Sequence, residues 1–199
     1  MLVGLRPIPT SPGRLDLWTR SVPHQTSSRE MTREFLIEVL SKYVQEPAKK
    51  LKRAERGKPY LLSKEVSFSV SHTVGWSSVC VGHKEVQVGI DIELRRRETI
   101  RSWRALRQRF FSPREALHVH SRLEFLEMWV CKEALVKATG QGIARGWSQF
   151  ELDRREGKLQ VDCGEGQWSI GVFETADLIG AWACDRETVR DVQIRNWEP

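Results

Sequence analysis

Three carboxylates and two lysines stand in two short stretches of the chain, in a pattern that suits metal and phosphate chemistry. Asp91 and Glu93 close the first stretch, and Lys132, Glu133 and Lys137 lie in the second. Carboxylate oxygens are ligands that Mg²⁺ prefers, and ammonium groups form charge-assisted hydrogen bonds with phosphate. Together the two stretches indicate a site at which one Mg²⁺ ion and one polyphosphate meet.

The first stretch is predicted to be a β-strand. Apolar and polar residues alternate from Val86 to Ile92, so Asp91 and Glu93 should leave the same face of a half-buried strand. Two carboxylates this close repel each other unless a cation lies between them. Gly89 leaves room for a ligand or another backbone to approach the strand.

The second stretch is predicted to lie on a helix over residues 122–139, with an apolar stripe along one face. Glu133 and Lys137 are four residues apart and are therefore neighbours on the exposed side of this helix. An ordinary surface ion pair is the alternative interpretation of these two residues, since such pairs are common and weak.

Two other candidate positions also have structural interpretations. Ser112, Pro113 and Glu115 form a capping box with proline at the first helical position, so helix initiation alone accounts for them. His72 follows a predicted strand, where a histidine is commonly a structural hydrogen-bonding residue. Neither position indicates chemistry by itself.

The ordered set of motifs resembles the 4'-phosphopantetheinyl transferases of the surfactin-synthetase type, over about residues 53–150. Five stretches keep the order and spacing of that family, followed by Gly140–Gly142: Arg56–Pro59, Phe68–His72, Val88–Glu93, Phe110–Glu115 and Trp129–Lys137. The resemblance implies an α+β fold of two pseudo-symmetric α/β halves, with the active site in the cleft between them. The implied halves are residues 1–88, on the nucleotide side of coenzyme A, and residues 89–199, which carry the metal and catalytic residues.

The resemblance also implies a role for each matched residue. Asp91, Glu93 and Glu133 would bind Mg²⁺, and Lys132 and Lys137 would contact the phosphates of coenzyme A. Glu133 and Lys137 would be catalytic, with Glu133 taking the proton of the attacking serine directly or through water. The nucleotide end of coenzyme A would be lined by Lys58, Pro59, Ser71 and His72.

The implied activity is that of a holo-acyl-carrier-protein synthase. The enzyme would transfer 4'-phosphopantetheine from coenzyme A to a serine hydroxyl of an apo acyl or peptidyl carrier protein, with Mg²⁺, and release 3',5'-ADP. Such a reaction serves fatty acid, polyketide or nonribosomal peptide biosynthesis, and the resemblance implies a monomer. The alternative is a non-catalytic protein that binds coenzyme A or a carrier protein, which the complete set of carboxylates disfavours.

The amino-acid composition limits the kinds of molecule that we expect the protein to bind. The chain has 199 residues and a net charge of +6, which suits an acidic partner such as a carrier protein. Its charges are dispersed and no nucleic-acid-binding motif appears, so we expect no nucleic-acid partner. Arg95–Arg97 suits either a docking surface for a carrier protein or a solvated loop, and Arg29 and Arg33 are candidates for the 3'-phosphate of coenzyme A.

We also expect a cytoplasmic protein without a membrane segment. The four cysteines lack a C-x-x-C pair and are expected to be reduced core thiols: Cys80, Cys131, Cys163 and Cys184. Four prolines interrupt residues 1–30, which contain no apolar run long enough for a signal peptide, and no segment could span a bilayer.

Hydrophobic periodicity predicts the elements that must position the site, after an irregular start. Helices are expected at residues 29–44, 100–107, 113–120 and 122–139. Strands are expected at residues 66–70, 77–82, 86–92, 150–152, 158–163, 168–173, 178–184 and 189–197.

Overall fold

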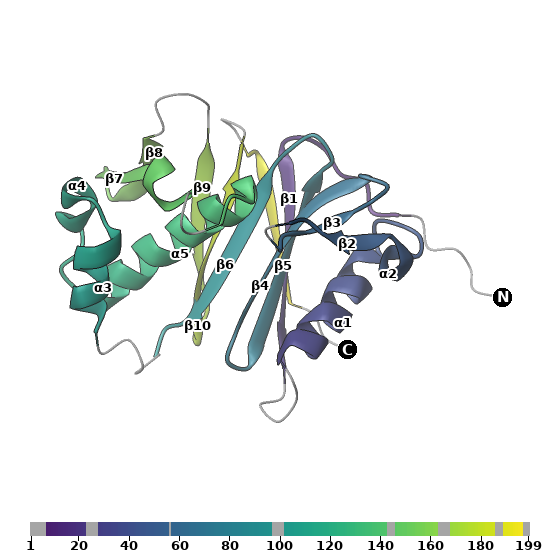
Figure 1. Cartoon of the computed structure of the whole chain (residues 1–199), viewed down its shortest axis with the longest axis horizontal. Helices are drawn as coiled ribbons and strands as arrows, with labels where there is room; N and C mark the ends of the chain where they lie inside the picture. Colours follow the sequence, from purple (N-terminus) through teal and green to yellow (C-terminus); the bar gives the residue numbers. More distant parts are fainter. Residues whose placement is uncertain are drawn as a thin grey trace.

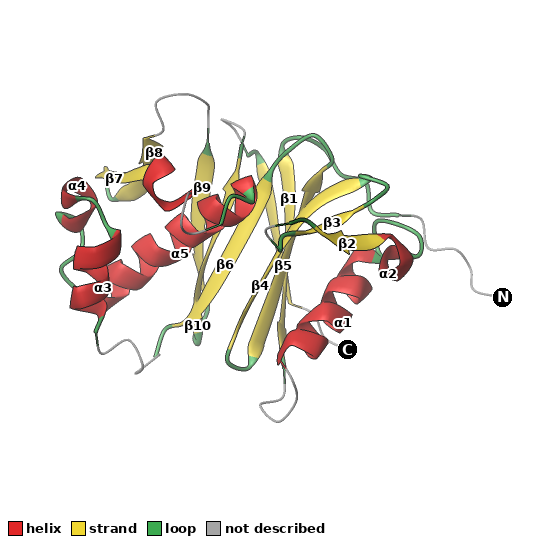
Figure 2. Cartoon of the chain, in the orientation of Figure 1, coloured by secondary structure: helices red, strands yellow, loops and turns green. Residues whose placement is uncertain are grey.

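The computed structural model describes residues 7–22, 28–55, 57–96, 102–142, 146–162, 168–185 and 189–196. Arg56, Arg97 and Cys163, which the sequence analysis considered, lie outside the described residues, as does the side chain of Arg29. The described residues form a four-stranded sheet, a three-stranded sheet and two small two-stranded sheets. Figures 1 and 2 show the two larger sheets side by side, with the longer helices packed against them.

The first sheet has the strand order β11-β1-β5-β4. Its members are β11 (Asp191–Asn196), β1 (Arg14–Ser21), β5 (Trp76–His83) and β4 (Val66–Thr73). Only the β1–β11 pair in this sheet is parallel. Helix α1 (Ser28–Leu40) contributes its apolar face to a core that it shares with three of these strands.

The second sheet has the order β6-β10-β9 and is antiparallel. Its strands are β6 (Val88–Leu94), β10 (Leu178–Cys184) and β9 (Ser169–Glu174), and α5 (Arg122–Thr139) packs across them. Helix α5 lies so close to β6 that a Cβ atom at Gly89 would sit 1.8 Å from the carbonyl oxygen of Ala134. The space that Gly89 leaves is therefore used by the helix backbone.

The remaining elements flank the two sheets. Beside the first sheet lie α2 (Pro47–Lys50), β2 (Leu51–Arg53) and β3 (Pro59–Leu61). Around α5 lie α3 (Trp103–Phe110), α4 (Pro113–Ala116), the 3-10 turn η1 (Trp147–Gln149), β7 (Glu151–Arg155) and β8 (Lys158–Asp162).

Serine hydroxyls join the facing edges of the two sheets. The backbone N–H of Ile90 donates to Ser69 Oγ at 3.2 Å, and that of Ile92 donates to Ser71 Oγ at 3.3 Å. Strands β4 and β6 are neighbours without a backbone ladder, so these side chains satisfy N–H groups of β6 that would otherwise be buried without a partner. The junction places the functional ends of β4 and β6 together.

The mixed α and β structure agrees with the expected α+β class, and the predicted limits of α5 and β10 are confirmed. The prediction of an irregular N-terminal segment was wrong for residues 14–21. These residues form β1, which lies between β11 and β5 in the first sheet. The helix predicted over residues 113–120 ends at Ala116. The division at residue 88 and the pseudo-symmetry stay predictions, and β11 returns from the second segment to pair with β1.

In the described part of the chain, no helix is long and apolar enough to cross a bilayer. The three described cysteines, Cys80, Cys131 and Cys184, are buried free thiols.

Candidate active site

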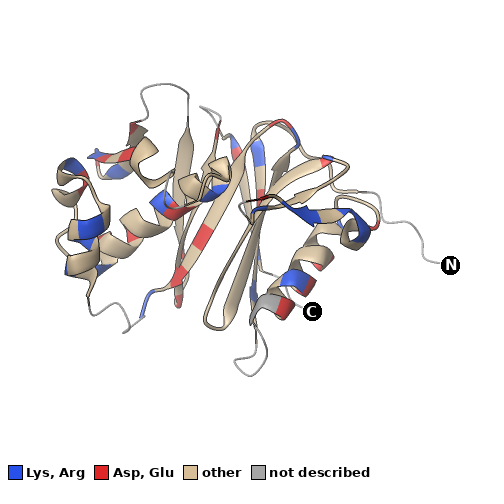
Figure 3. Ribbon diagram, viewed as in Figure 1, with Lys and Arg blue, Asp and Glu red and all other residues tan. Residues whose placement is uncertain are grey.

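A cleft of about 1210 Å³ opens where the two sheets meet, and it gathers most of the predicted site residues. Its walls come from α1, β2, β4, β6 and α5. Figure 3 shows the acidic positions of β6 and the basic positions of β2 in this region. The polar and aromatic side chains that line the cleft include Arg33, Lys52, Arg53, Lys58, Ser71, His72, Asp91, Glu93, Trp129, Glu133 and Lys137.

Asp91 lies at the centre of a hydrogen-bonded cluster drawn from three elements. The residue is 6% exposed, and its Oδ1 accepts hydrogen bonds from Lys137 Nζ at 2.6 Å and from Ser71 Oγ at 2.8 Å. Lys137 also donates to Ser71 Oγ at 2.9 Å. The cluster joins β6, α5 and β4, so any ligand that draws Lys137 away must compete with Asp91.

Glu93 and Glu133 complete the acidic part of the cleft. Thr73 Oγ1 donates to Glu93 Oε2 at 3.2 Å. Burial, together with the negative charges of Asp91 and Glu93, raises the pKa of Glu133 to about 7, although the positive charge of Lys137 opposes the rise. A carboxylate with a raised pKa among like charges is typical of functional sites and is relieved by a bound cation.

The three carboxylates suit Mg²⁺ in kind, since all their donor atoms are oxygens. Among the described residues, however, no three His, Cys, Asp or Glu side chains are gathered closely enough to hold a metal ion. The ammonium of Lys137 contacts Asp91 at 2.6 Å, so it supplies the positive charge beside that carboxylate. A metal set of Asp91, Glu93 and Glu133 therefore stays a prediction.

Lys58 reaches the C-terminal end of α5 from the opposite wall. Its Nζ donates to the carbonyl of Ala138 at 2.6 Å and to that of Val88 at 3.4 Å. Burial lowers the pKa of Lys58 to about 8. This amine is held beside Gly140, where an added Cβ would lie 3.2 Å from Lys58 Cδ.

The structure does not bring Lys132 to the cleft. This side chain is 3% exposed and donates to Glu115 Oε1 at 2.7 Å and to the carbonyl of Phe150 at 3.1 Å. Successive helical residues are about 100° apart, so Lys132 points away from the cleft that Glu133 faces. The expected phosphate contact at Lys132 is thus not supported, and Lys132 pairs with Glu115 instead.

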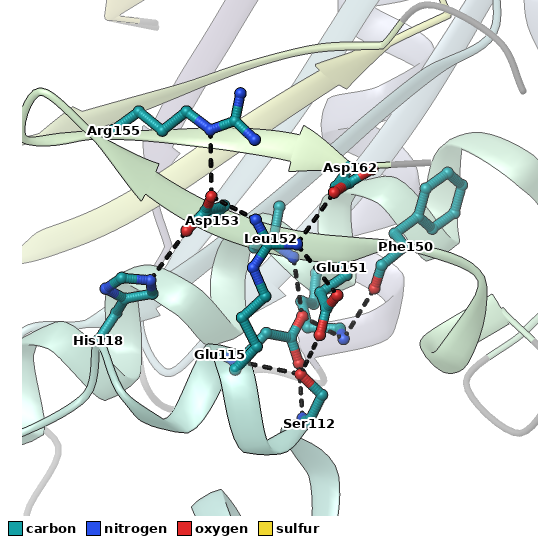
Figure 4. A network of polar contacts seen from close by, with 11 residues as sticks. Ser112, Glu115, His118, Phe150, Glu151, Leu152, Asp153, Arg155 and Asp162 are labelled. Atoms are coloured by element: carbon teal, nitrogen blue, oxygen red, sulfur yellow. Dashed lines mark hydrogen bonds and ion pairs between the residues drawn. The ribbon is translucent and has the colours of Figure 1, made fainter. Parts of the chain in front are cut away.

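The capping box at Ser112 is confirmed, but Glu115 does more than cap a helix. Its fully buried carboxylate also accepts the backbone N–H of Leu152 at 3.0 Å, as Figure 4 shows among the surrounding polar contacts. His118 is partly buried, and its Nε2 atom lies 3.0 Å from Asp153 Oδ1.

Sequence reasoning missed two basic residues of the cleft, Lys52 and Arg53, but named a third, Arg33, as a candidate for the 3'-phosphate. Lys52 and Arg53 belong to β2, and Arg33 lies on α1. A run of basic residues over positions 49–53 was the available signal. Strand β2 reaches the cleft because it pairs with β3, which begins at Pro59, directly after Lys58. This pairing places Lys52 and Arg53 beside Lys58, and the run of basic residues alone does not reveal it.

Residues 87–184 match the model of the 4'-phosphopantetheinyl transferase superfamily. The chain is 36% identical over 100 residues to 4'-phosphopantetheinyl transferase HetI of Nostoc sp., a match that covers 45% of this chain and 41% of HetI. It is 26% identical over 160 residues to 4'-phosphopantetheinyl transferase gsp of Aneurinibacillus migulanus, covering 77% of this chain and 63% of gsp.

The chain spans about half the length of the curated relatives that it matches, between 41% and 63%. The matched region contains β6, α5 and β10, and therefore the three cleft carboxylates and Lys137. Over residues 87–184 the chain is thus similar to the 4'-phosphopantetheinyl transferase superfamily.

Proposed function

We propose that this protein transfers 4'-phosphopantetheine from coenzyme A to a serine hydroxyl of an apo acyl or peptidyl carrier protein and releases 3',5'-ADP. One observation carries the proposal. A single cleft gathers Asp91, Glu93 and Glu133 together with Lys58 and Lys137, which is the charge pattern that a metal-bound pyrophosphate requires. The similarity to gsp supports placing the protein with the surfactin-synthetase type, and we propose that it acts as a monomer in the cytoplasm.

Coenzyme A would lie along the cleft with its nucleotide end toward the first sheet. The cleft volume of about 1210 Å³ exceeds the range of about 300–1,000 Å³ that is usual for small-ligand sites, so it offers room for a long ligand. Arg33, Lys52 and Arg53 would provide the charge for the 3'-phosphate. The nucleotide side would be lined by Lys58, Pro59, Ser71 and His72, as the family resemblance implies.

The acidic end of the cleft would carry out the chemistry. Mg²⁺ held by Asp91, Glu93 and Glu133 would neutralise charge on the pyrophosphate oxygens. Lys137 would exchange its contact with Asp91 for a phosphate oxygen and add fixed positive charge where negative charge develops.

Glu133 would accept the proton of the attacking serine, directly or through water, since a carboxylate with a pKa near 7 is suited to that task. The serine oxygen would form a bond to the β-phosphorus. The bond from that phosphorus to the bridging oxygen would break, and 3',5'-ADP would leave.

Release of 3',5'-ADP tests this function. The protein is incubated with coenzyme A, Mg²⁺ and a panel of apo carrier proteins, and the nucleotide product is quantified by chromatography. We expect release that needs a carrier protein and is lost in Asp91→Ala and Glu133→Ala. Glu127→Gln is the matched control on α5, because Glu127 pairs with Arg154 on β7 and does not line the cleft.

Two results would refute the proposal. The first is release that Asp91→Ala and Glu133→Ala leave unchanged. The second is coenzyme A binding without release for every carrier, which would indicate a non-catalytic binding protein.

A further inference from the structure

A buried ion pair lies on a different face of α5 from the residues that line the cleft. Lys132 and Glu115 are 3% and 0% exposed, and Lys132 Nζ lies 2.7 Å from Glu115 Oε1. Replacing such a pair with well-packed apolar residues is often neutral or stabilising, because removing two charges from water is costly. A contribution to stability is therefore a weak explanation for this pair.

The contacts of the pair connect α5 to three other segments. Glu115 Oε1 also accepts from Leu152 N, and Oε2 accepts from the backbone N–H of Ser112 at 2.9 Å. Lys132 also donates to the carbonyl of Phe150, and its Nζ lies 5.4 Å from the ring centroid of Trp147. The other hydrogen bonds of the two side chains thus go to the start of α4, to β7 and to Phe150, the residue before β7; Figure 4 shows those of Glu115.

The face of α5 toward the cleft carries the residues of the proposed reaction. Trp129, Glu133 and Lys137 follow one another at intervals of four residues, so they share that face and all line the cleft. Lys132 directly precedes Glu133. A rotation or slide of α5 that broke the contacts of Lys132 would therefore move Glu133 and Lys137 relative to Asp91.

The opposite constraint on α5 comes from β6. The backbone of α5 at Ala134 and Ala138 already packs directly against Gly89, so the helix has no room to move closer to the strand. The hydrogen bonds of Lys132 and Glu115 join the helix to α4 and to the segment that enters β7, on the face away from the strand. Helix α5 is held between a packing contact on one side and a set of charged hydrogen bonds on the other.

We propose that Lys132 and Glu115 are positioning residues that hold Glu133 and Lys137 at the reacting end of the cleft, and that turnover depends on them while coenzyme A binding does not. This inference rests on the proposed transferase function. Neither residue of the pair lines the cleft, so its removal takes no direct contact from a ligand.

The test is the double variant Glu115→Gln/Lys132→Met, which removes both charges together and leaves an amide oxygen for Leu152 N–H. We expect kcat to fall by at least 10-fold and as much as about 100-fold, which is the effect of a misplacement of about 1 Å. We expect the Kd for coenzyme A to stay within about two-fold, as measured by calorimetry. Amide hydrogen exchange in residues 129–137 should become faster, while exchange in β4 and β5 should not change.

The matched control is Glu127→Gln/Arg154→Met. That pair also joins α5 to β7 and is partly exposed, but it lies nearer the start of the helix. We expect the control to keep the kcat of the unmodified protein. An equal fall in kcat in the control would overturn the proposal, because any loosening of the contact between α5 and β7 would then suffice.

Other outcomes also decide the question. Unchanged kcat and unchanged exchange in the double variant would overturn the proposal, as would a loss of coenzyme A binding as large as the loss of kcat. If the double variant does not fold, Glu115→Gln alone should give the same split between kcat and Kd. If the unmodified protein transfers nothing, the proposed function fails, and hydrogen exchange in residues 129–137 still decides whether the pair positions α5.

Discussion

Replacing Gly89 with alanine tests how closely the cleft depends on the packing of α5 against β6. The added Cβ would lie 1.8 Å from the carbonyl oxygen of Ala134 and 2.7 Å from the amide nitrogen of Ala138. Both are backbone atoms, so no side-chain rotation relieves the overlap. Because a real Cβ contact is essentially never shorter than 3.0 Å, the helix must retreat by at least about 1.2 Å.

Two effects of Gly89→Ala follow from that displacement. Overpacking a well-packed core typically costs about 1–3 kcal/mol, and we expect the upper part of that range because the obstacle is backbone. Glu133 adjoins Ala134, so the reacting groups should separate from Asp91, and a misplacement of about 1 Å costs about 100-fold in rate. Urea unfolding measures the first effect, and the rate of carrier modification measures the second.

Gly146→Ala is the control for this experiment. Gly146 also adjoins α5, but a Cβ there would meet only the side chain of Val136, at 3.2 Å and beyond. We expect it to change the free energy of unfolding by less than about 1 kcal/mol and to keep activity. If Gly89→Ala were as stable and as active as this control, the packing argument for the site would be refuted.

Three further predictions concern capping, pH dependence and the metal set. Ser112→Ala should lower the free energy of unfolding by about 1 kcal/mol in urea titrations, because Ser112 Oγ accepts from Glu115 N at 3.1 Å; no loss would exclude this cap as a stabilising contact. The pKa of Lys58 is lowered from 10.5 to about 8, so between those pH values the unfolded state binds more protons and stability rises with pH. Lys58→Met should remove about 2 kcal/mol of that rise between pH 7.5 and 10, and an identical pH dependence in both proteins would contradict it. Removing Mg²⁺ with EDTA should stop carrier modification while circular dichroism stays unchanged, and activity that persists would exclude the metal.

Local patterns were sufficient for the elements that carry the site. The apolar periodicity and the N-terminal capping box of α5 are both local, and its predicted limits agree with the structure. The alternation in β6 correctly placed Asp91 and Glu93 on one strand. These signals depend on residues a few positions apart, which is the range over which helix and strand patterns act.

Long-range pairing explains what the sequence did not reveal. Strand β1 is central because β5 and β11 flank it, and β11 comes from the far end of the chain. The family resemblance assigned Lys132 to the phosphates of coenzyme A. Helix α5 is buried on nearly all sides, however, so a lysine within it needs a buried partner. That partner, Glu115, is supplied by another helix, and only the packing of α4 on α5 identifies it.

Intact mass spectrometry of carrier proteins tests the central claim most directly. Apo acyl and peptidyl carrier proteins are incubated with this protein, coenzyme A and Mg²⁺, and each product is weighed. The account predicts a mass gain of one phosphopantetheine on a carrier serine, absent without Mg²⁺ and absent with Glu133→Ala. No gain on any carrier, with coenzyme A still bound to the protein, would contradict it.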